Sequence, residues 1–312
     1  MNARFASARV CCLLILLQSV LFGLMDALLK IVYRDVPVSC FLAFRFLLAV
    51  LVFLAFWRGP ILSDLKRAPL RRYLLPCVSM AASTVACNMA VHLTAVSTVG
   101  FLRSLSCALT PLLLIALRRR PCTARELVLC GLVMTGLYLL CAKNGLPVFG
   151  PGEILAFLAA LLVACALICS ADSLHYVSAV TLSFLQCVSA CAICLVLGLV
   201  QDGFTAEGLI SLCTPRNLSI LIYGTLGCTV GGYLLQNIAL SSLSARSTGL
   251  LQGTYPVCTA AAAWLLLGES MSASGIAGAA LVLVCIWASA GDHAQTRSAH
   301  APAAWPPHSA RA

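Results

Sequence analysis

Apolar residues run through this chain in ten long stretches, which are separated by short segments carrying charge, glycine or proline. Each stretch approaches the roughly 20 residues of helix that cross a bilayer. The runs are continuous and lack the alternation typical of an outer-membrane β-barrel. They predict ten transmembrane helices, over residues 10–32, 38–57, 72–94, 97–117, 125–142, 152–171, 178–200, 218–240, 245–267 and 272–290.

Composition excludes a soluble globular protein. Of the 312 residues, 61% are apolar and only 10% are charged, whereas about 25% are charged in a soluble domain. The fold class is therefore an all-α polytopic membrane protein, and the connections leave no room for a separate soluble catalytic domain. Most of the 18 cysteines lie inside apolar runs, where a thiol packs as a small hydrophobe. Cys191 and Cys194 have a metal-like spacing but lack partners for a tetrahedral site, so we expect neither a metal nor another cofactor.

Positive charges predict the orientation, because Lys and Arg in short loops stay on the cytoplasmic side. With the N-terminus inside, the opposite side holds only Arg34, Lys143 and Arg216. The cytoplasmic segments hold Arg4, Arg9, Arg58, Lys66, Arg67, Arg71, Arg72, Arg118, Arg119, Arg120, Arg125, Arg297 and Arg311. We therefore expect both termini in the cytoplasm, and the Ala- and Pro-rich residues 291–312 to form a disordered tail.

The sequence contains a faint internal repeat. One constant shift places Asn88 on Asn237, Gly100 on Gly249 and Arg103 on Gln252, and a slightly smaller shift places Arg45 on Gln186. These shifts predict two repeats of five helices, over residues 1–145 and 146–290. Because five is odd, the second repeat enters the membrane from the opposite side. Inverted repeats around one central site are typical of secondary transporters.

Polar side chains inside the spans are candidate site residues, because each is costly in hydrocarbon and usually faces a cavity or a partner. Depth along each helix, at about 1.5 Å per residue, divides them into two sets. The outer set is Asp26, Lys30, Arg45, Asn88, His92 and Arg103, and the inner set is Gln186, Asn237, Arg246 and Gln252. We expect a basic outer vestibule and an amide-lined inner one. Because an arginine fork suits carboxylate or phosphate, the substrate is expected to carry an anionic group.

Other interpretations of the charged residues stay open at this point. Asp26 and Lys30 are four residues apart and could pair with each other, while Lys30 and Arg246 could extend to water. Asp26 and His92 are the titratable groups able to couple transport to protons. His92, which lies near a helix end, could equally be an interfacial residue with no such role.

Several segments resemble the drug/metabolite transporter superfamily, specifically its ten-helix EamA-type branch. They are Phe41–Phe46, Thr254–Val257 and Leu267–Glu269, and Phe22-Gly23 stands where the family often has Trp-Gly. The first repeat departs from the pattern, since Cys107 aligns with Pro256 and Arg120 with Glu269. The resemblance implies export of small, often amino-acid-like metabolites across the bacterial inner membrane. Tyr255, inside the best-matching segment, joins the candidate substrate-binding residues.

The sequence therefore predicts an ATP-independent exporter of a small anionic or zwitterionic metabolite, working by alternating access. ATP hydrolysis by this chain is not expected, because it has no phosphate-binding GxxxxGK[ST] loop. Expected partners are the substrate and the lipid bilayer, with a proton or counter-substrate and a homodimer left open; nucleic acid is not expected. An organellar nucleotide-sugar or sugar-phosphate exchanger and a membrane receptor or regulator remain alternatives. An intramembrane enzyme is disfavoured, because no HExxH or GxGD motif is present.

Overall fold

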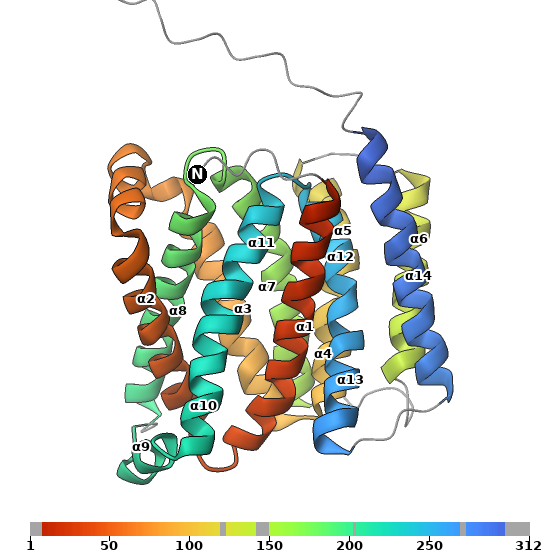
Figure 1. Cartoon of the computed structure of the whole chain (residues 1–312). Helices are drawn as coiled ribbons and strands as arrows, with labels where there is room; N and C mark the ends of the chain where they lie inside the picture. Colours follow the sequence, from red (N-terminus) through yellow and green to blue (C-terminus); the bar gives the residue numbers. More distant parts are fainter. Residues whose placement is uncertain (1–7, 119–122, 142–149, 202–203, 269–272, 297–312) are drawn as a thin grey trace, which may run out of the picture.

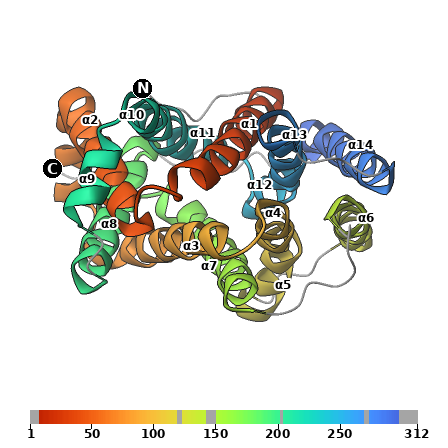
Figure 2. The same cartoon turned by 90° about the horizontal axis from the view of Figure 1, so that it is seen from below.

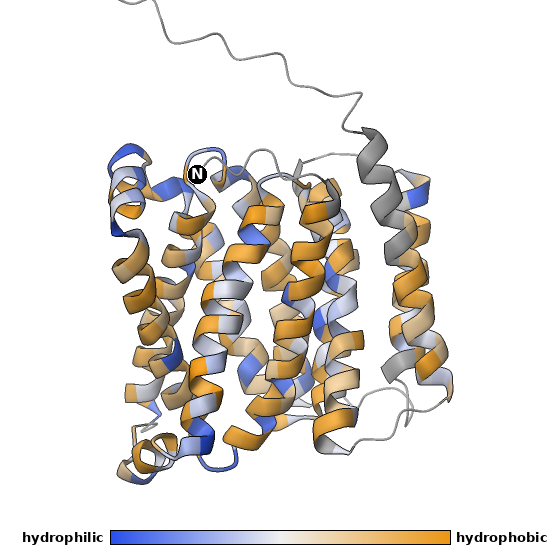
Figure 3. Ribbon diagram, viewed as in Figure 1, coloured by the Kyte–Doolittle hydropathy of each residue, from blue (hydrophilic) through white to orange (hydrophobic). Residues whose placement is uncertain are grey.

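The computed structural model describes residues 8–118, 123–141, 150–201, 204–268 and 273–296. In these residues the chain is built from helices that stand side by side across the molecule (Figure 1). We call the face at which the first helix begins the N-terminal face, and the opposite one the distal face. Apolar residues dominate the length of the helices, and polar residues gather at the two faces and at a few interior positions (Figure 3). This distribution is the one expected for a protein surrounded by lipid.

The elements follow one another without long connections. They are α1 (Ala8–Val32), α2 (Val38–Arg67), η1 (Leu70–Arg72), α3 (Leu74–Leu93), α4 (Val96–Ser104), α5 (Ser106–Arg118), α6 (Ala124–Cys141), α7 (Pro151–Ser173), α8 (Ala179–Val200), α9 (Ala206–Leu212), α10 (Pro215–Tyr223), η2 (Gly224–Gly232), α11 (Tyr233–Leu240), α12 (Ala245–Leu251), η3 (Gln252–Thr254), α13 (Tyr255–Leu267) and α14 (Ala273–Thr296).

These elements form ten membrane-crossing units, as the hydropathy pattern predicts. Among the described residues, seven stretches are long and apolar enough to span a membrane: α1, α2, α3, α4 with α5, α7, α8, and α10 with η2 and α11. The shorter apolar stretches Leu127–Leu139 and Ala273–Cys285 lie in α6 and α14. The unit formed by α12, η3 and α13 completes the ten.

The largest departures from the predicted helices are at three places. The helix predicted to end at residue 57 has non-helical backbone there, with φ −130° and ψ 23° at Trp57, and a second helical stretch then continues to Arg67. The short helix α9 was not predicted. Its N-terminus is capped by the Thr205 hydroxyl, which accepts from the Gly208 amide at 3.1 Å. At the C-terminus α14 continues to Thr296, and the remainder of the predicted tail, residues 297–312, lies outside the described residues.

Three of the crossing units are irregular near their middle. The helical path of α4 and α5 breaks at Leu105, and that of α12 and α13 is interrupted by the 3₁₀ turn η3. Between α10 and α11 the chain forms a π-helix, η2, with the glycine-rich sequence GTLGCTVGG. Departures of this kind within helices often mark functional sites, and two of the three border the cavity described below.

The repeat predicted from the sequence is confirmed by the element boundaries. The shift that places Asn88 on Asn237 also moves both ends of α5 onto the ends of α13, and the start of α6 onto the start of α14. The shift that places Arg45 on Gln186 moves the start of α2 onto that of α8. Each repeat therefore contributes five crossing units, α1–α6 and α7–α14.

The two repeats pack reciprocally, as a pseudo-two-fold axis requires. In one pair of contacts α4 packs on α13 and α5 on α12; in another α3 packs on α7 and α1 on α11. Two helices pack on their own equivalents, α2 on α8 and α6 on α14. Seen along the helices, the pair α2 and α8 lies at one end of the molecule and α6 and α14 at the other (Figure 2).

Close packing near the axis follows the same reciprocity. A Cβ atom at Gly100 would lie 3.7 Å from the Thr259 side chain, and one at Gly249 would lie 3.2 Å from the Thr110 hydroxyl. Gly249 is the repeat equivalent of Gly100, and Thr259 is that of Thr110. The pairs of helices at the centre therefore meet through the same small-residue contact twice, once on each side of the axis.

Candidate functional site

A small cavity at the centre of the molecule lies among α1, α4, η3 and α13, with one lining residue each from α5 and α7. Its volume is about 30 Å³, which is room for one or two water molecules. The residues lining it are Gln18, Ser19, Phe22, Arg103, Ser104, Ser106, Val163, Gln252 and Tyr255. Both repeats contribute to this lining, so a molecule held here would contact both.

Opposite charges meet beside this cavity. The Tyr255 hydroxyl donates to Oδ2 of Asp26, and the Thr259 hydroxyl lies 3.4 Å from the same oxygen. The guanidinium carbon of Arg103 lies 4.8 Å from the Tyr255 ring centre and 5.9 Å from that of Phe22. Tyr255 thus stands between a buried carboxylate, 6% exposed, and a cation that faces the cavity.

Amide side chains from both repeats form a second group at the cavity. Gln236 Oε1 accepts from Gln18 Nε2 at 2.7 Å and from Gln252 Nε2 at 3.0 Å. Two buried amide atoms of this group, Gln18 Oε1 and Gln236 Nε2, have no hydrogen-bond partner within the described part of the chain. Gln18 lines the cavity and Gln236 contacts two residues that do, so these two unmet atoms, which are costly to leave buried, lie beside it.

Arg45 is buried but does not line the cavity. Its Nε donates to the Thr229 hydroxyl at 2.7 Å and to the Gly224 carbonyl at 3.1 Å. Both acceptors belong to the π-helix η2, and the Thr225 hydroxyl lies 3.4 Å from the Arg45 carbonyl. The guanidinium of α2 in the first repeat therefore holds the irregular segment of the second repeat in place.

A row of aromatic rings separates the two arginines. Tyr233 lies 6.5 Å from Phe22, which contacts Arg103, and 6.4 Å from Phe46, whose ring centre is 5.7 Å from the Arg45 guanidinium carbon. The Tyr233 hydroxyl is 2.8 Å from the Thr84 hydroxyl. The structure therefore gives each arginine its own surroundings, where the sequence predicted one shared basic vestibule.

The remaining candidate residues of the spans form hydrogen bonds within or between helices. Asn237 Nδ2 donates to Gln186 Oε1 at 2.9 Å and to the Ser183 hydroxyl at 2.8 Å, which joins α11 to α8. Asn88 Oδ1 accepts from the Tyr33 hydroxyl at 2.7 Å. These contacts connect helices and lie outside the cavity lining, although the sequence placed Asn88, Gln186 and Asn237 among the substrate-binding residues.

The predicted division into outer and inner vestibules is wrong at the centre of the molecule. Arg103, assigned to the outer set, and Gln252, assigned to the inner set, line the same cavity. The two residues are repeat equivalents, and because both lie close to the pseudo-two-fold axis, the inversion of depth between the repeats separates them little. Assignment by depth along separate helices missed this because it takes no account of helix breaks and tilts.

Two further residues, His92 and Lys30, lie at the distal ends of their helices, away from the cavity. His92 is exposed, and its ring meets the Tyr33 ring edge-on at 6.4 Å. Lys30 Nζ donates to the carbonyls of Val91 and Thr94, at 2.9 and 2.8 Å. A cation at the C-terminal end of a helix is favourable, so Lys30 stabilises the end of α3.

Sequence reasoning missed three residues of the cavity lining on α1. Gln18 lies four residues before Phe22 and eight before Asp26, and this spacing places all three on one helix face. Ser19 Oγ accepts from the Thr254 hydroxyl at 2.8 Å. The spacing back from Asp26 was the available signal for Gln18 and Phe22, and depth alone did not reveal it.

A comparison with solved structures shows that other proteins share this fold. Among solved structures, one described as "Crystal structure of protein" is 15% identical in sequence, with a TM-score of 0.75, and covers 93% of this chain and 99% of that one. At this identity the likeness concerns the fold alone. No curated protein matches the sequence.

A family model matches nearly the whole length of the chain. The EamA-like transporter family matches twice, over residues 9–142 and 150–290. The two matches correspond to the two halves that the structure relates by a pseudo-two-fold axis. A polytopic helical bundle with inverted repeats, a small central cavity and two matches to one transporter family leads to a single conclusion: this integral membrane protein belongs to the EamA-like transporter family.

Proposed function

We propose that this chain is a secondary transporter that exports a small zwitterionic or anionic metabolite by alternating access. The observation that carries the proposal is the pairing of Asp26 and Arg103 across Tyr255 at the central cavity, which both repeats line. Arg103 offers a fork for a carboxylate or phosphate group. Asp26 offers a counter-charge for an ammonium group. The free amide atoms of Gln18 and Gln236 can then orient the rest of the molecule.

The transport cycle follows from the symmetry of the fold. A cavity of about 30 Å³ is smaller than a metabolite, so the site must widen before a substrate can enter it. Because α4 packs on α13 as α5 packs on α12, the two repeats can exchange conformations and open the same site to either face. Arg45 contributes by holding η2 against α2, and substrate contact falls to Arg103.

The proposed location is the bacterial inner membrane with the N-terminal face in the cytoplasm. Support comes from the cations at that face, which include Arg58, Lys66, Arg67, Arg71 and Arg72 at the end of α2 and in η1. At the distal face the described cations are Arg34 and Arg216 in or beside the loops and Lys30 near the end of α1. Cytoplasmic retention of Lys and Arg accounts for this difference.

The test compares metabolites that accumulate outside cells expressing the wild-type chain, Arg103→Gln or Asp26→Asn, at matched membrane levels. Arg58→Gln, which removes an exposed cation far from the cavity, is the matched control. We expect an anionic or zwitterionic compound to accumulate with the wild type and the control, and at least tenfold less with Arg103→Gln. Equal accumulation in all four would overturn the proposed site.

Proteoliposomes separate the competing functions. Net efflux of the identified compound down its gradient is the result expected of an exporter. Movement only when a second compound is present on the other side would identify an obligate exchanger, the alternative that a basic site also suits. Binding without flux in either direction would indicate a receptor.

A further inference from the structure

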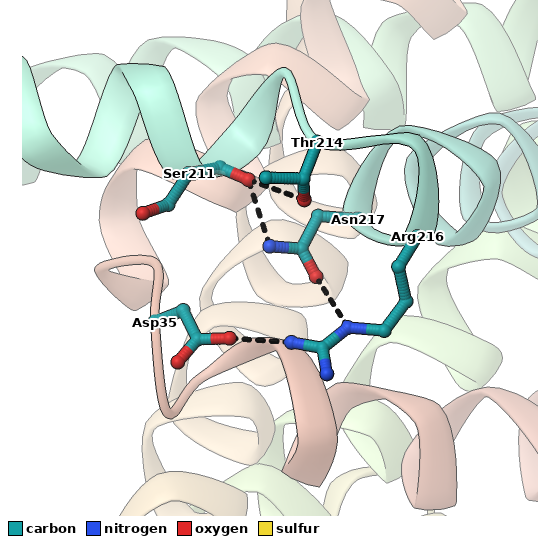
Figure 4. A network of polar contacts seen from close by, with 5 residues as sticks. All are labelled: Asp35, Ser211, Thr214, Arg216 and Asn217. Carbon is teal, nitrogen blue, oxygen red and sulfur yellow. Dashed lines mark hydrogen bonds and ion pairs between the residues drawn. The ribbon is translucent and has the colours of Figure 1, made fainter.

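An ion pair joins the two repeats at the distal face. Arg216, at the start of α10, pairs with Asp35 in the loop between α1 and α2 (Figure 4). The same guanidinium lies within hydrogen-bond distance of Asn217 Oδ1, at 3.4 Å, and Asn217 Nδ2 donates to the Ser211 carbonyl at 2.8 Å. These residues line a broad hollow of about 600 Å³. The α9–α10 turn thus holds Arg216 in position to reach the other repeat.

A different contact joins the repeats at the N-terminal face. The guanidinium carbon of Arg72, in η1, lies 4.4 Å from the ring centre of Tyr176, in the loop between α7 and α8. The Arg72 carbonyl accepts from the Ser173 hydroxyl at 2.5 Å. At this face the arginine belongs to the first repeat and its partner to the second, whereas at the distal face the arginine belongs to the second repeat and its partner to the first.

The two contacts occupy equivalent places in the repeats. The shift that aligns the starts of α2 and α8 also places Asp35 on Tyr176, and each of these two residues lies three positions before its helix. Their partners, Arg216 and Arg72, stand at the start of the third crossing unit of the opposite repeat. Each contact therefore connects the loop after a first helix to the start of a third helix across the axis.

We infer that these contacts are a pair of latches, one at each face, and that each holds its own face of the transporter closed. Because their chemistry differs, opening at the two faces depends differently on dissolved salt. The inference rests on the alternating access proposed above. In the state in which both contacts are formed, the central cavity has a volume of about 30 Å³. The Asp35–Arg216 latch is an ion pair whose side chains are 45% and 58% exposed, so dissolved salt screens it. The Arg72–Tyr176 latch is a cation–π contact and depends less on salt.

Opening can be measured without a substrate, through a buried thiol. Cys87, in α3, is 4% exposed, so a soluble reagent can reach its thiol only after the packing of the bundle opens. The probe is a membrane-impermeant maleimide added to one face of oriented vesicles, with modification of each cysteine peptide quantified by mass spectrometry. Cys213, exposed three residues before Arg216, normalises the amount of protein and reagent at the distal face.

For the distal latch, we expect Asp35→Asn and Arg216→Gln to raise the rate of Cys87 modification from the distal face at least threefold. The charge swap Asp35→Arg with Arg216→Asp should return the rate toward that of the wild type. Arg34→Gln, which changes the charge of the same loop, should leave it unchanged. In the wild type, high salt should raise modification from the distal face and leave the other face unaffected.

For the N-terminal latch, Arg72→Gln and Tyr176→Leu should raise Cys87 modification from the N-terminal face at least threefold, whereas Tyr176→Phe, which keeps the ring, should not. Unchanged rates in both sets, or an equal rise from both faces, would overturn the latches. Side-specific changes without flux of any compound in liposomes would leave the latches standing and overturn the transporter proposal instead.

Discussion

Thr84 and Tyr233 occupy equivalent positions in the two repeats and contact each other through their hydroxyls at 2.8 Å. Residues related by a two-fold axis can touch only where they lie at the axis itself. The contact therefore fixes the position of the pseudo-two-fold axis inside the bundle. It also places one hydrogen bond at the point that both conformations of an alternating transporter share.

A double-mutant cycle on Thr84→Val and Tyr233→Phe is expected to give a coupling free energy of about 0.5–1.5 kcal/mol. The measurement is chemical unfolding in detergent. As a control, Thr135→Val should combine additively with Tyr233→Phe, since the Thr135 hydroxyl donates to the Gly131 carbonyl within its own helix. Additive effects of Thr84→Val and Tyr233→Phe would show that the axis contact contributes nothing to stability.

Tyr255→Phe is expected to reduce the free energy of unfolding by about 1–3 kcal/mol, because the buried Asp26 carboxylate loses a hydrogen-bond donor. Chemical unfolding of the wild type and the variant in the same detergent and lipid measures this difference in free energy. In an Asp26→Asn background the same substitution should cost less, since a neutral amide is less costly to leave unpaired. An equal cost in both backgrounds would mean that Tyr255 acts through packing alone.

Gly23→Ala should destabilise the protein by about 1–3 kcal/mol through overpacking. A Cβ atom at Gly23 would lie 2.7 Å from the Cys258 carbonyl carbon and 2.7 Å from the Thr259 nitrogen, which are backbone atoms unable to move aside. Gly131→Ala is the matched control, because a Cβ atom there meets nothing within 4 Å. The melting temperatures of the two variants in detergent provide the comparison, and equal values would contradict the close approach of α1 and α13.

The two intramembrane arginines are expected to affect transport kinetics differently. Arg103→Lys keeps the charge at the cavity but loses the fork, so it should raise KM at least fivefold with a smaller change in kcat. Arg45→Lys loses the Nε donor shared by Gly224 and Thr229, so it should lower kcat with KM nearly unchanged. Initial-rate measurements in proteoliposomes decide this. The reverse pattern would assign substrate contact to Arg45.

Most of the fold was predictable because hydrophobic length alone determines a membrane span. All ten crossing units fall where the apolar runs lie, and the odd number of helices per repeat predicted their inversion. The short helix α9 was not predicted, because its seven residues contain no apolar run long enough to cross the membrane. Its Thr205 cap was the only local signal, and caps are common in loops.

The candidate site was less predictable, because helix rotation and breaks decide which polar side chains meet. The sequence indicated that Arg45 and Arg103 are both deep in the membrane, and it treated them alike. It could not reveal that Arg45 faces the π-helix, since glycine-rich segments are equally compatible with a straight α-helix. Gln252 was placed on the inner side, although the turn η3 brings it level with Arg103.

The small volume of the central cavity also has an effect on the host membrane. A column of water crossing the roughly 30 Å hydrocarbon core does not fit in a space of about 30 Å³. The one or two water molecules that this cavity can hold do not by themselves form a path for protons or small ions from face to face. An idle copy in this state would therefore not discharge the membrane potential through its central cavity.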